Sequence, residues 1–130
     1  MPPAKIWVVD DDQDDLDTLQ DLFEQAGLDQ QVSFFQHSSQ VLEHLCSKNK
    51  EALPALILSD LNMPVLSGLD LVQAVQKMNL LSQLDIIILT TSSSPSDKAR
   101  CLMAGAKDYL IKPLRVQEYQ ELISSLKIYL

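Results

Sequence analysis

The chain has 130 residues, of which 46% are hydrophobic and 22% charged, and its formal net charge is −8. This composition predicts one globular domain and excludes disordered, collagen-like and membrane-spanning proteins. The excess of acidic residues argues against direct binding of nucleic acid, because phosphate contacts need clustered lysine and arginine.

The few glycine and cysteine residues exclude further classes of protein. Gly27, Gly68 and Gly105 lie in separate segments, so the sequence has no glycine-rich loop of the kind that cradles a nucleotide phosphate. Cys46 and Cys101 belong to no metal-binding or redox motif, and no signal peptide precedes the first apolar run. We therefore expect a cytoplasmic protein with no membrane association.

Short apolar runs alternate with segments of helical periodicity along the whole chain. The runs are almost uniformly apolar, as is typical of strands that are buried on both faces. They are Ile6–Val9, Val32–Phe35, Ala55–Leu58, Ile86–Leu89 and Tyr109–Ile111. The intervening segments repeat apolar residues every three or four positions, as do Leu16, Leu19 and Leu22. This alternation predicts a doubly wound α/β domain, with a parallel five-stranded sheet and helices on both faces.

The sequence also marks several helix ends. Ser94 and Asp97 flank a proline and predict the capped start of the fourth helix, and Ser67 and Asp70 predict the start of the third. Gly105 follows the fourth helical segment, where a left-handed residue is favoured.

Polar side chains follow four of the five predicted strands. The carboxyl ends of parallel strands meet at one edge of the sheet, where doubly wound domains bind their ligands. The residues expected at this edge are Asp10, Asp11 and Asp12, then Asp60 and Asn62, then Thr90, and finally Lys112 and Pro113.

These residue types indicate phosphoryl transfer. Carboxylates gathered at one point repel one another, and oxygen ligands without imidazole are those preferred by Mg²⁺ or Mn²⁺. Protein-bound Mg²⁺ usually combines one or two carboxylates with a phosphate oxygen, and a carboxylate can itself accept a phosphoryl group. Lys112 would neutralise one phosphoryl oxygen, and the Thr90 hydroxyl would donate a hydrogen bond to another.

Together these motifs resemble the receiver domain of two-component response regulators, of the stand-alone, single-domain type. Their order and spacing carry the resemblance, which runs from about Lys5 to the C-terminus. The motifs are Asp10-Asp11, the segment from Asp60 through Met63-Pro64 to Gly68, Thr90, and Lys112-Pro113. The resemblance implies a single receiver domain over residues 1–130, with a flavodoxin-like (βα)5 fold and strand order 2-1-3-4-5.

The resemblance also implies a role for each acidic residue. Asp60 is the implied phosphoacceptor. Asp10 and Asp11 are implied to hold Mg²⁺ together with Asp60 and the backbone carbonyl of Asn62. The implied phosphodonor is the phosphohistidine of a sensor histidine kinase or of a histidine phosphotransfer protein, with a small acyl phosphate as an alternative donor.

The remaining motif residues are implied to work as a switch. Thr90 and Lys112 would contact the phosphoryl group, and Tyr109 would be the aromatic residue that rotates as Thr90 moves. The peptide bond between Lys112 and Pro113 is implied to be cis.

The implied output is a surface formed by the fourth helix, fifth strand and fifth helix. A downstream effector protein or a second copy of the chain would read this surface, because no output domain follows the fifth helix. The chain would then catalyse only its own phosphorylation and dephosphorylation.

Some residues leave alternatives open. Thr91 and Leu114 depart from the family pattern, which often has a small residue at the first position and an aromatic residue at the second. Asp12, Asp14 and Asp15 either cap the first helix or surround the bound cation, and we favour capping.

Two other functions remain to be weighed. A haloacid-dehalogenase-like phosphatase would use Asp10 and Asp12 as its D-x-D pair, although the threonine that normally follows is replaced by Gln13-Asp14. A scaffold with the same fold would work without phosphorylation.

Overall fold

The computed structural model describes residues 4–47 and 52–130. Five parallel strands form one sheet in the order β2-β1-β3-β4-β5, which confirms the predicted fold class and strand order. The strands are β1 Ile6–Val9, β2 Val32–Phe35, β3 Leu56–Ser59, β4 Asp85–Thr90 and β5 Asp108–Ile111. The ranges predicted for β1 and β2 agree with the structure; those for β3 and β4 differ by one residue at each end, and that for β5 by one residue at its start.

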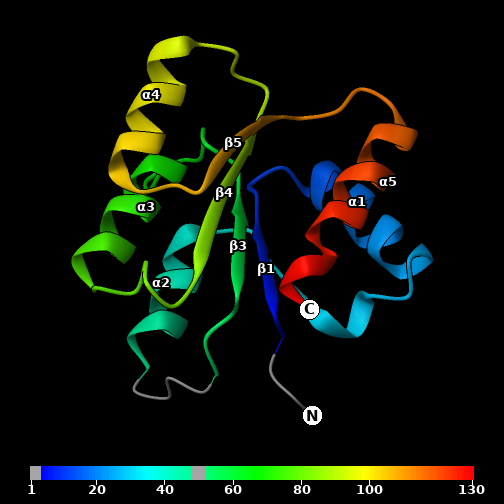
Figure 1. Ribbon diagram of the computed structural model, residues 1–130, viewed down its shortest axis with the longest axis horizontal. Helices are drawn as coiled ribbons and strands as arrows, with labels where there is room; N and C mark the ends of the chain where they lie inside the picture. The colour runs from blue at the N-terminus through cyan, green and yellow to red at the C-terminus, as the bar shows by residue number, and fades with distance from the viewer. Residues whose placement is uncertain (1–3, 48–51) are drawn as a thin grey trace.

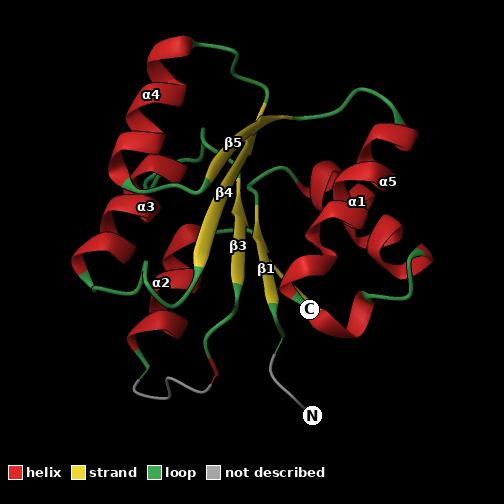
Figure 2. Ribbon diagram, in the orientation of Figure 1, coloured by secondary structure: helices red, strands yellow, loops and turns green. Residues whose placement is uncertain are grey.

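Helices cover both faces of the sheet (Figures 1 and 2). The α-helices are α1 Gln13–Gln25, α2 Ser38–Cys46, α3 Gly68–Lys77, α4 Pro95–Ala104 and α5 Val116–Ser125. Short 3₁₀ helices occur at η1 Asp29–Gln31 and η3 Leu126–Tyr129. Helices α1 and α5 lie on one face, and α2, α3 and α4 lie on the other. In the described ranges, every helix is too short or too polar to span a bilayer.

Two hydrophobic clusters, one on each face of the sheet, explain the uniformly apolar strands. Successive strand side chains point to opposite faces. In β1, Ile6 and Val8 pack with α1 and α5, whereas Trp7 and Val9 pack with α2 and α3. Since both faces are covered, every residue of β1 is buried.

Side-chain caps begin three of the helices that follow the site loops, α1, α3 and α4. The Asp12 carboxylate accepts hydrogen bonds from the backbone amides of Asp14 and Asp15, which confirms the capping interpretation for Asp12. Ser67 and Asp70 form the predicted capping box of α3. Helix α4 begins at the cap Ser94 and ends at the left-handed Gly105, as predicted. These caps mark where the loops after β1, β3 and β4 end.

Candidate functional site

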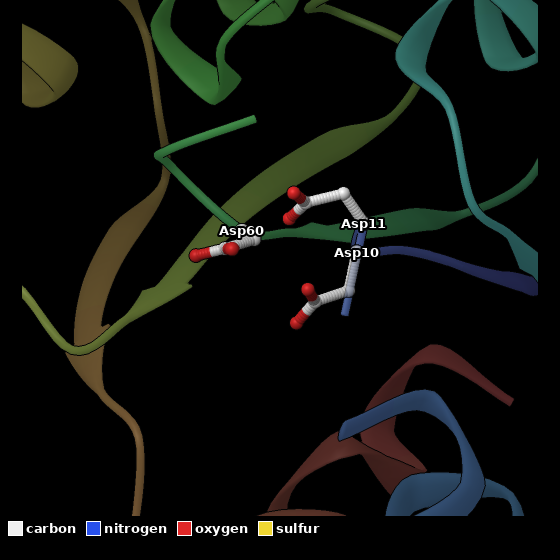
Figure 3. A group of neighbouring side chains, drawn as sticks. All are labelled: Asp10, Asp11 and Asp60. Carbon is white, nitrogen blue, oxygen red and sulfur yellow. The ribbon is translucent and has the colours of Figure 1, made fainter. Parts of the chain in front are cut away.

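Three carboxylates meet at the carboxyl edge of the sheet. Val9 pairs with Ser59 in the parallel ladder, so the residues that follow β1 and β3 emerge side by side. Asp10, Asp11 and Asp60 each place a carboxylate oxygen within 4.8 Å of the other two. Figure 3 shows these three side chains next to one another. A set of hard oxygen donors at this spacing fits Mg²⁺ or Mn²⁺.

The Asp60 backbone is held closely by its neighbours. Its carbonyl accepts a hydrogen bond from the Ser59 hydroxyl at 2.8 Å, and its carboxylate accepts one from the Leu61 amide at 2.8 Å. The Gly68 amide donates to the Leu61 carbonyl, and an added Cβ at Gly68 would lie only 2.3 Å from the Asp60 carbonyl oxygen. The loop after β3 can therefore fold back over Asp60 only because residue 68 has no side chain.

Asp10 lies in a more buried position and uses both of its oxygens. Its residue surface is 3% exposed, against 8% for Asp60. One oxygen accepts a hydrogen bond from the Asp12 amide at 2.9 Å, and the other pairs with the Lys112 ammonium at 2.8 Å. The Asp12 carboxylate is itself engaged in capping α1.

Lys112 brings the positive charge to the site from the end of β5. Its backbone amide donates to the Thr90 carbonyl, which holds this segment against β4. Its ammonium nitrogen lies 2.8 Å from Asp10, 2.7 Å from Asp15 and 3.6 Å from Asp60. The ammonium is thus shared by three carboxylates, and the contact with Asp60 is the longest of the three.

Burial governs the charge states of these groups. It raises the pKa of Asp10 from 3.8 to about 6, an effect that the Lys112 ammonium only partly offsets. Burial also raises the pKa of Asp60. For Lys112, burial lowers the pKa, but hydrogen bonds with Asp10 and Asp15 outweigh it and hold the pKa above its ordinary value. The site therefore keeps an excess of negative charge that a divalent cation would relieve.

Thr90 and Tyr109 are connected through Ser92 in the loop after β4. The Thr90 hydroxyl oxygen accepts a hydrogen bond from the Ser92 amide at 3.2 Å, and the Tyr109 hydroxyl donates to the Ser92 carbonyl at 2.8 Å. The Ser92 hydroxyl donates to the Asp97 carboxylate on α4 at 2.7 Å. Both Thr90 and Tyr109 are buried. Ser92 therefore contacts Thr90, Tyr109 and the start of α4.

The chain also matches a known protein family in its sequence. The sequence model described as "Response regulator receiver domain" matches residues 6–124. The chain belongs to this family. The resemblance inferred from the motifs is thereby confirmed for almost the whole chain.

This receiver domain is also similar to individual proteins and to solved structures of other proteins. It is 36% identical over 115 residues to the transcriptional regulatory protein PrrA of Mycobacterium leprae, covering 88% of this chain and 46% of PrrA. The chain thus spans less than half of PrrA, and it spans 34% of the rice response regulator ORR1. The chemotaxis protein CheY4 of Vibrio cholerae has 29% identity and a TM-score of 0.77, covering 98% of this chain and 99% of CheY4. The Mn²⁺-bound response regulator Rcp1 shares the fold, with 20% identity, a TM-score of 0.79 and coverage of 96% and 92%.

The prediction of a cis bond between Lys112 and Pro113 is wrong. In residues 4–47 and 52–130 of this receiver domain, every peptide bond is trans. The trans form is favoured by about 0.5–1 kcal/mol even before proline. Since the Lys112 ammonium reaches Asp10 and Asp15 with a trans bond, these ion pairs do not require the cis form.

Sequence reasoning missed two residues that the receiver fold places in or beside the site. Asp15 was interpreted as a helix-capping acid, yet its carboxylate pairs with Lys112. Ser92 belongs to none of the motifs, yet it joins Thr90 to Tyr109. Neither belongs to a motif, so no signal in the sequence distinguishes them from neighbouring polar residues. The exposed Asn62 follows Asp60 by two residues, and the role of its carbonyl remains a prediction.

We expect Tyr109→Phe to lower the free energy of unfolding by about 1 kcal/mol, because the Ser92 carbonyl loses a partly buried hydrogen bond. The aromatic ring keeps its place in the core, so the fold is retained. Urea unfolding measures the change. Tyr129→Phe is a matched comparison, since the Tyr129 hydroxyl donates to Asp85 at 2.8 Å far from the site loop. A Tyr109→Phe protein as stable as the wild type would contradict this account of the Ser92 carbonyl.

Proposed function

We propose that this receiver domain is the phosphoacceptor of a two-component phosphorelay, and that Asp60 is the residue that accepts the phosphoryl group. The observation that carries the proposal is the grouping around Asp60. Carboxylates of Asp10 and Asp11 lie within 4.8 Å of it, and the Lys112 ammonium lies 3.6 Å away. In this arrangement an anionic acceptor and an anionic donor can approach each other next to compensating positive charge.

The proposed reaction forms one bond and breaks one bond. An Asp60 carboxylate oxygen attacks phosphorus, and the phosphorus–nitrogen bond of a phosphohistidine breaks, with its electron pair returning to the imidazole. The phosphodonor would be a sensor histidine kinase or a histidine phosphotransfer protein, or a small acyl phosphate, whose phosphorus–oxygen bond would break instead. Hydrolysis of the aspartyl phosphate by water then resets the domain. Its catalysis would be confined to its own phosphorylation and dephosphorylation.

The residues around Asp60 would have distinct tasks. Asp10, Asp11, Asp60 and the Asn62 carbonyl would hold Mg²⁺ or Mn²⁺, which when bound would neutralise the carboxylates and the phosphoryl oxygens. The Mn²⁺-bound state of Rcp1, a protein of the same fold, supports this choice of cation. Lys112 would donate to a phosphoryl oxygen.

The switching step would start at Thr90. Its hydroxyl would donate to a phosphoryl oxygen, and the movement would pass through Ser92 to Tyr109 and α4. The surface of α4, β5 and α5 carries exposed apolar side chains that an effector protein or a second copy of the chain would cover. They are Leu102, Met103, Ile111, Leu114 and Val116. Residues 1–130 would act in the cytoplasm as one receiver domain, without binding nucleic acid.

Phosphorylation by acetyl phosphate tests the proposed function. With Mg²⁺ present, we expect the wild-type mass to increase by one phosphoryl group, and Asp60→Asn to show no increase. Asp14→Asn is the control, because Asp14 is an exposed acid in the first turn of α1. If Asp14→Asn also failed to gain a phosphoryl group, the result would indicate a general effect of charge.

The two alternatives predict different results. A phosphatase that used Asp10 would still be phosphorylated in Asp60→Asn but not in Asp10→Asn. The capping role of Asp12 already argues against this function. A scaffold would take up no phosphoryl group, and the fluorescence of Trp7, which lies in β1 and contacts Phe35, would not respond to Mg²⁺ or beryllium fluoride.

A further inference from the structure

Among the described residues, Asp15 is an acid outside the site motifs whose carboxylate contacts Lys112. It lies in the first turn of α1, and its carboxylate is 2.7 Å from the Lys112 ammonium. The two residues are 97 positions apart, since Asp15 lies on α1 and Lys112 directly follows β5. The Asp15 side chain is 32% exposed, against 10% for that of Lys112. Asp15 is therefore the more exposed member of the pair.

The geometry places the Lys112 ammonium closer to α1 than to the proposed acceptor. A lysine ammonium has three donors. Two make short charge-assisted bonds to Asp10 and Asp15, whereas Asp60 at 3.6 Å lies outside the usual hydrogen-bond range. To donate a hydrogen bond to Asp60, the ammonium must move, and its short bonds to Asp10 and Asp15 restrain that movement.

We propose that Asp15 is a positioning residue that restrains Lys112 and thereby slows phosphoryl transfer to Asp60, an inference that rests on the proposed function. Asp15 takes up part of the positive charge that would otherwise stabilise the phosphoryl oxygens.

A helix-start role does not account for Asp15. Acidic residues favour the first turn of any helix through the helix dipole. Asp14 occupies the same turn and has the same charge, and Asp12 supplies the cap. Of the acids in residues 12–15, all described by the structure, only Asp15 pairs with Lys112. Asp14→Asn is therefore a matched control for the loss of one negative charge at this helix end.

The test compares initial rates of phosphorylation of the full chain by acetyl phosphate at saturating Mg²⁺ and pH 7. Because releasing one partly exposed charge-assisted bond is worth up to a factor of about ten, we expect Asp15→Asn to react at least about threefold faster than the wild type. Asp14→Asn should differ from the wild type by less than about 1.5-fold, the range typical of a distant exposed charge. Circular dichroism verifies that the variants are folded.

A double-mutant cycle separates positioning of Lys112 from simple charge repulsion. In a Lys112→Met background, Asp15→Asn should no longer accelerate the reaction beyond Asp14→Asn. An acceleration that persists there, an equal acceleration in Asp14→Asn, or an unchanged or slower rate in Asp15→Asn would each overturn the inference while leaving the proposed function intact. If neither the wild type nor Asp15→Asn is phosphorylated at Asp60, both the inference and the proposed function fail.

Discussion

Replacing Gly68 by alanine is expected to destabilise the protein and to displace Asp60. The added Cβ would lie 2.3 Å from the Asp60 carbonyl oxygen and 3.0 Å from the Leu61 Cα, and both are backbone atoms that cannot rotate away. Alanine normally stabilises a helix by up to about 1 kcal/mol relative to glycine. Overpacking costs about 1–3 kcal/mol, so we expect the clash to decide the sign.

Urea unfolding with and without Mg²⁺ measures both consequences. Gly68→Ala should lower the free energy of unfolding and also reduce the stabilisation by Mg²⁺, since the Asp60 carboxylate moves with its backbone. Gly27→Ala is the control. A Cβ at Gly27 meets no atom within 4 Å, but its φ of +75° costs an alanine about 1–2 kcal/mol. That variant should keep its response to Mg²⁺. A Gly68→Ala protein with full stability and an unchanged Mg²⁺ response would contradict the close approach seen here.

Without metal, the protein is expected to become less stable as the pH rises from about 4 to about 6. Burial raises the pKa of Asp10 from 3.8 in an ordinary environment to about 6 in the fold. Between these values the folded state binds the proton more tightly than the unfolded state, so protonation stabilises the fold. Above pH 6 the full cost of the buried charge is present, at most about 3 kcal/mol for a shift of this size. The raised pKa of Asp60 acts in the same direction.

Asp10→Asn should remove this cost. In EDTA at pH 7.5 we expect its free energy of unfolding to exceed that of the wild type by about 1–3 kcal/mol, because a buried charge is replaced by a neutral amide. Lys112 retains its ion pair with Asp15. The variant should also lose most of its stabilisation by Mg²⁺.

Asp14→Asn is again the comparison, because it removes an exposed charge and leaves the three clustered carboxylates intact. It should change the metal-free stability little and keep the Mg²⁺ response. If Asp10→Asn were instead less stable than the wild type in EDTA, the ion pair with Lys112 would outweigh the cost of burying Asp10.

The sequence by itself determined the elements and the edge of the sheet at which the polar residues gather. The uniformly apolar run Ile6–Val9 indicated a strand covered on both faces, and the two hydrophobic clusters confirm it. Parallel strands end at the same edge, so the meeting of Asp10 with Asp60 followed from topology. These predictions succeeded because periodicity is a property of local sequence, and because alternating strands and helices favour parallel strands.

Only the tertiary structure decided which side chains pair across elements. Asp14 and Asp15 are equivalent in the sequence as acids of one helix turn, and the placement of α1 beside the carboxyl end of β5 brings Asp15, not Asp14, to Lys112. The link from Thr90 through Ser92 to Tyr109 depends in the same way on the path of the loop after β4. Such contacts depend on the packing of whole elements, because a small rotation of a helix exchanges one side chain for its neighbour.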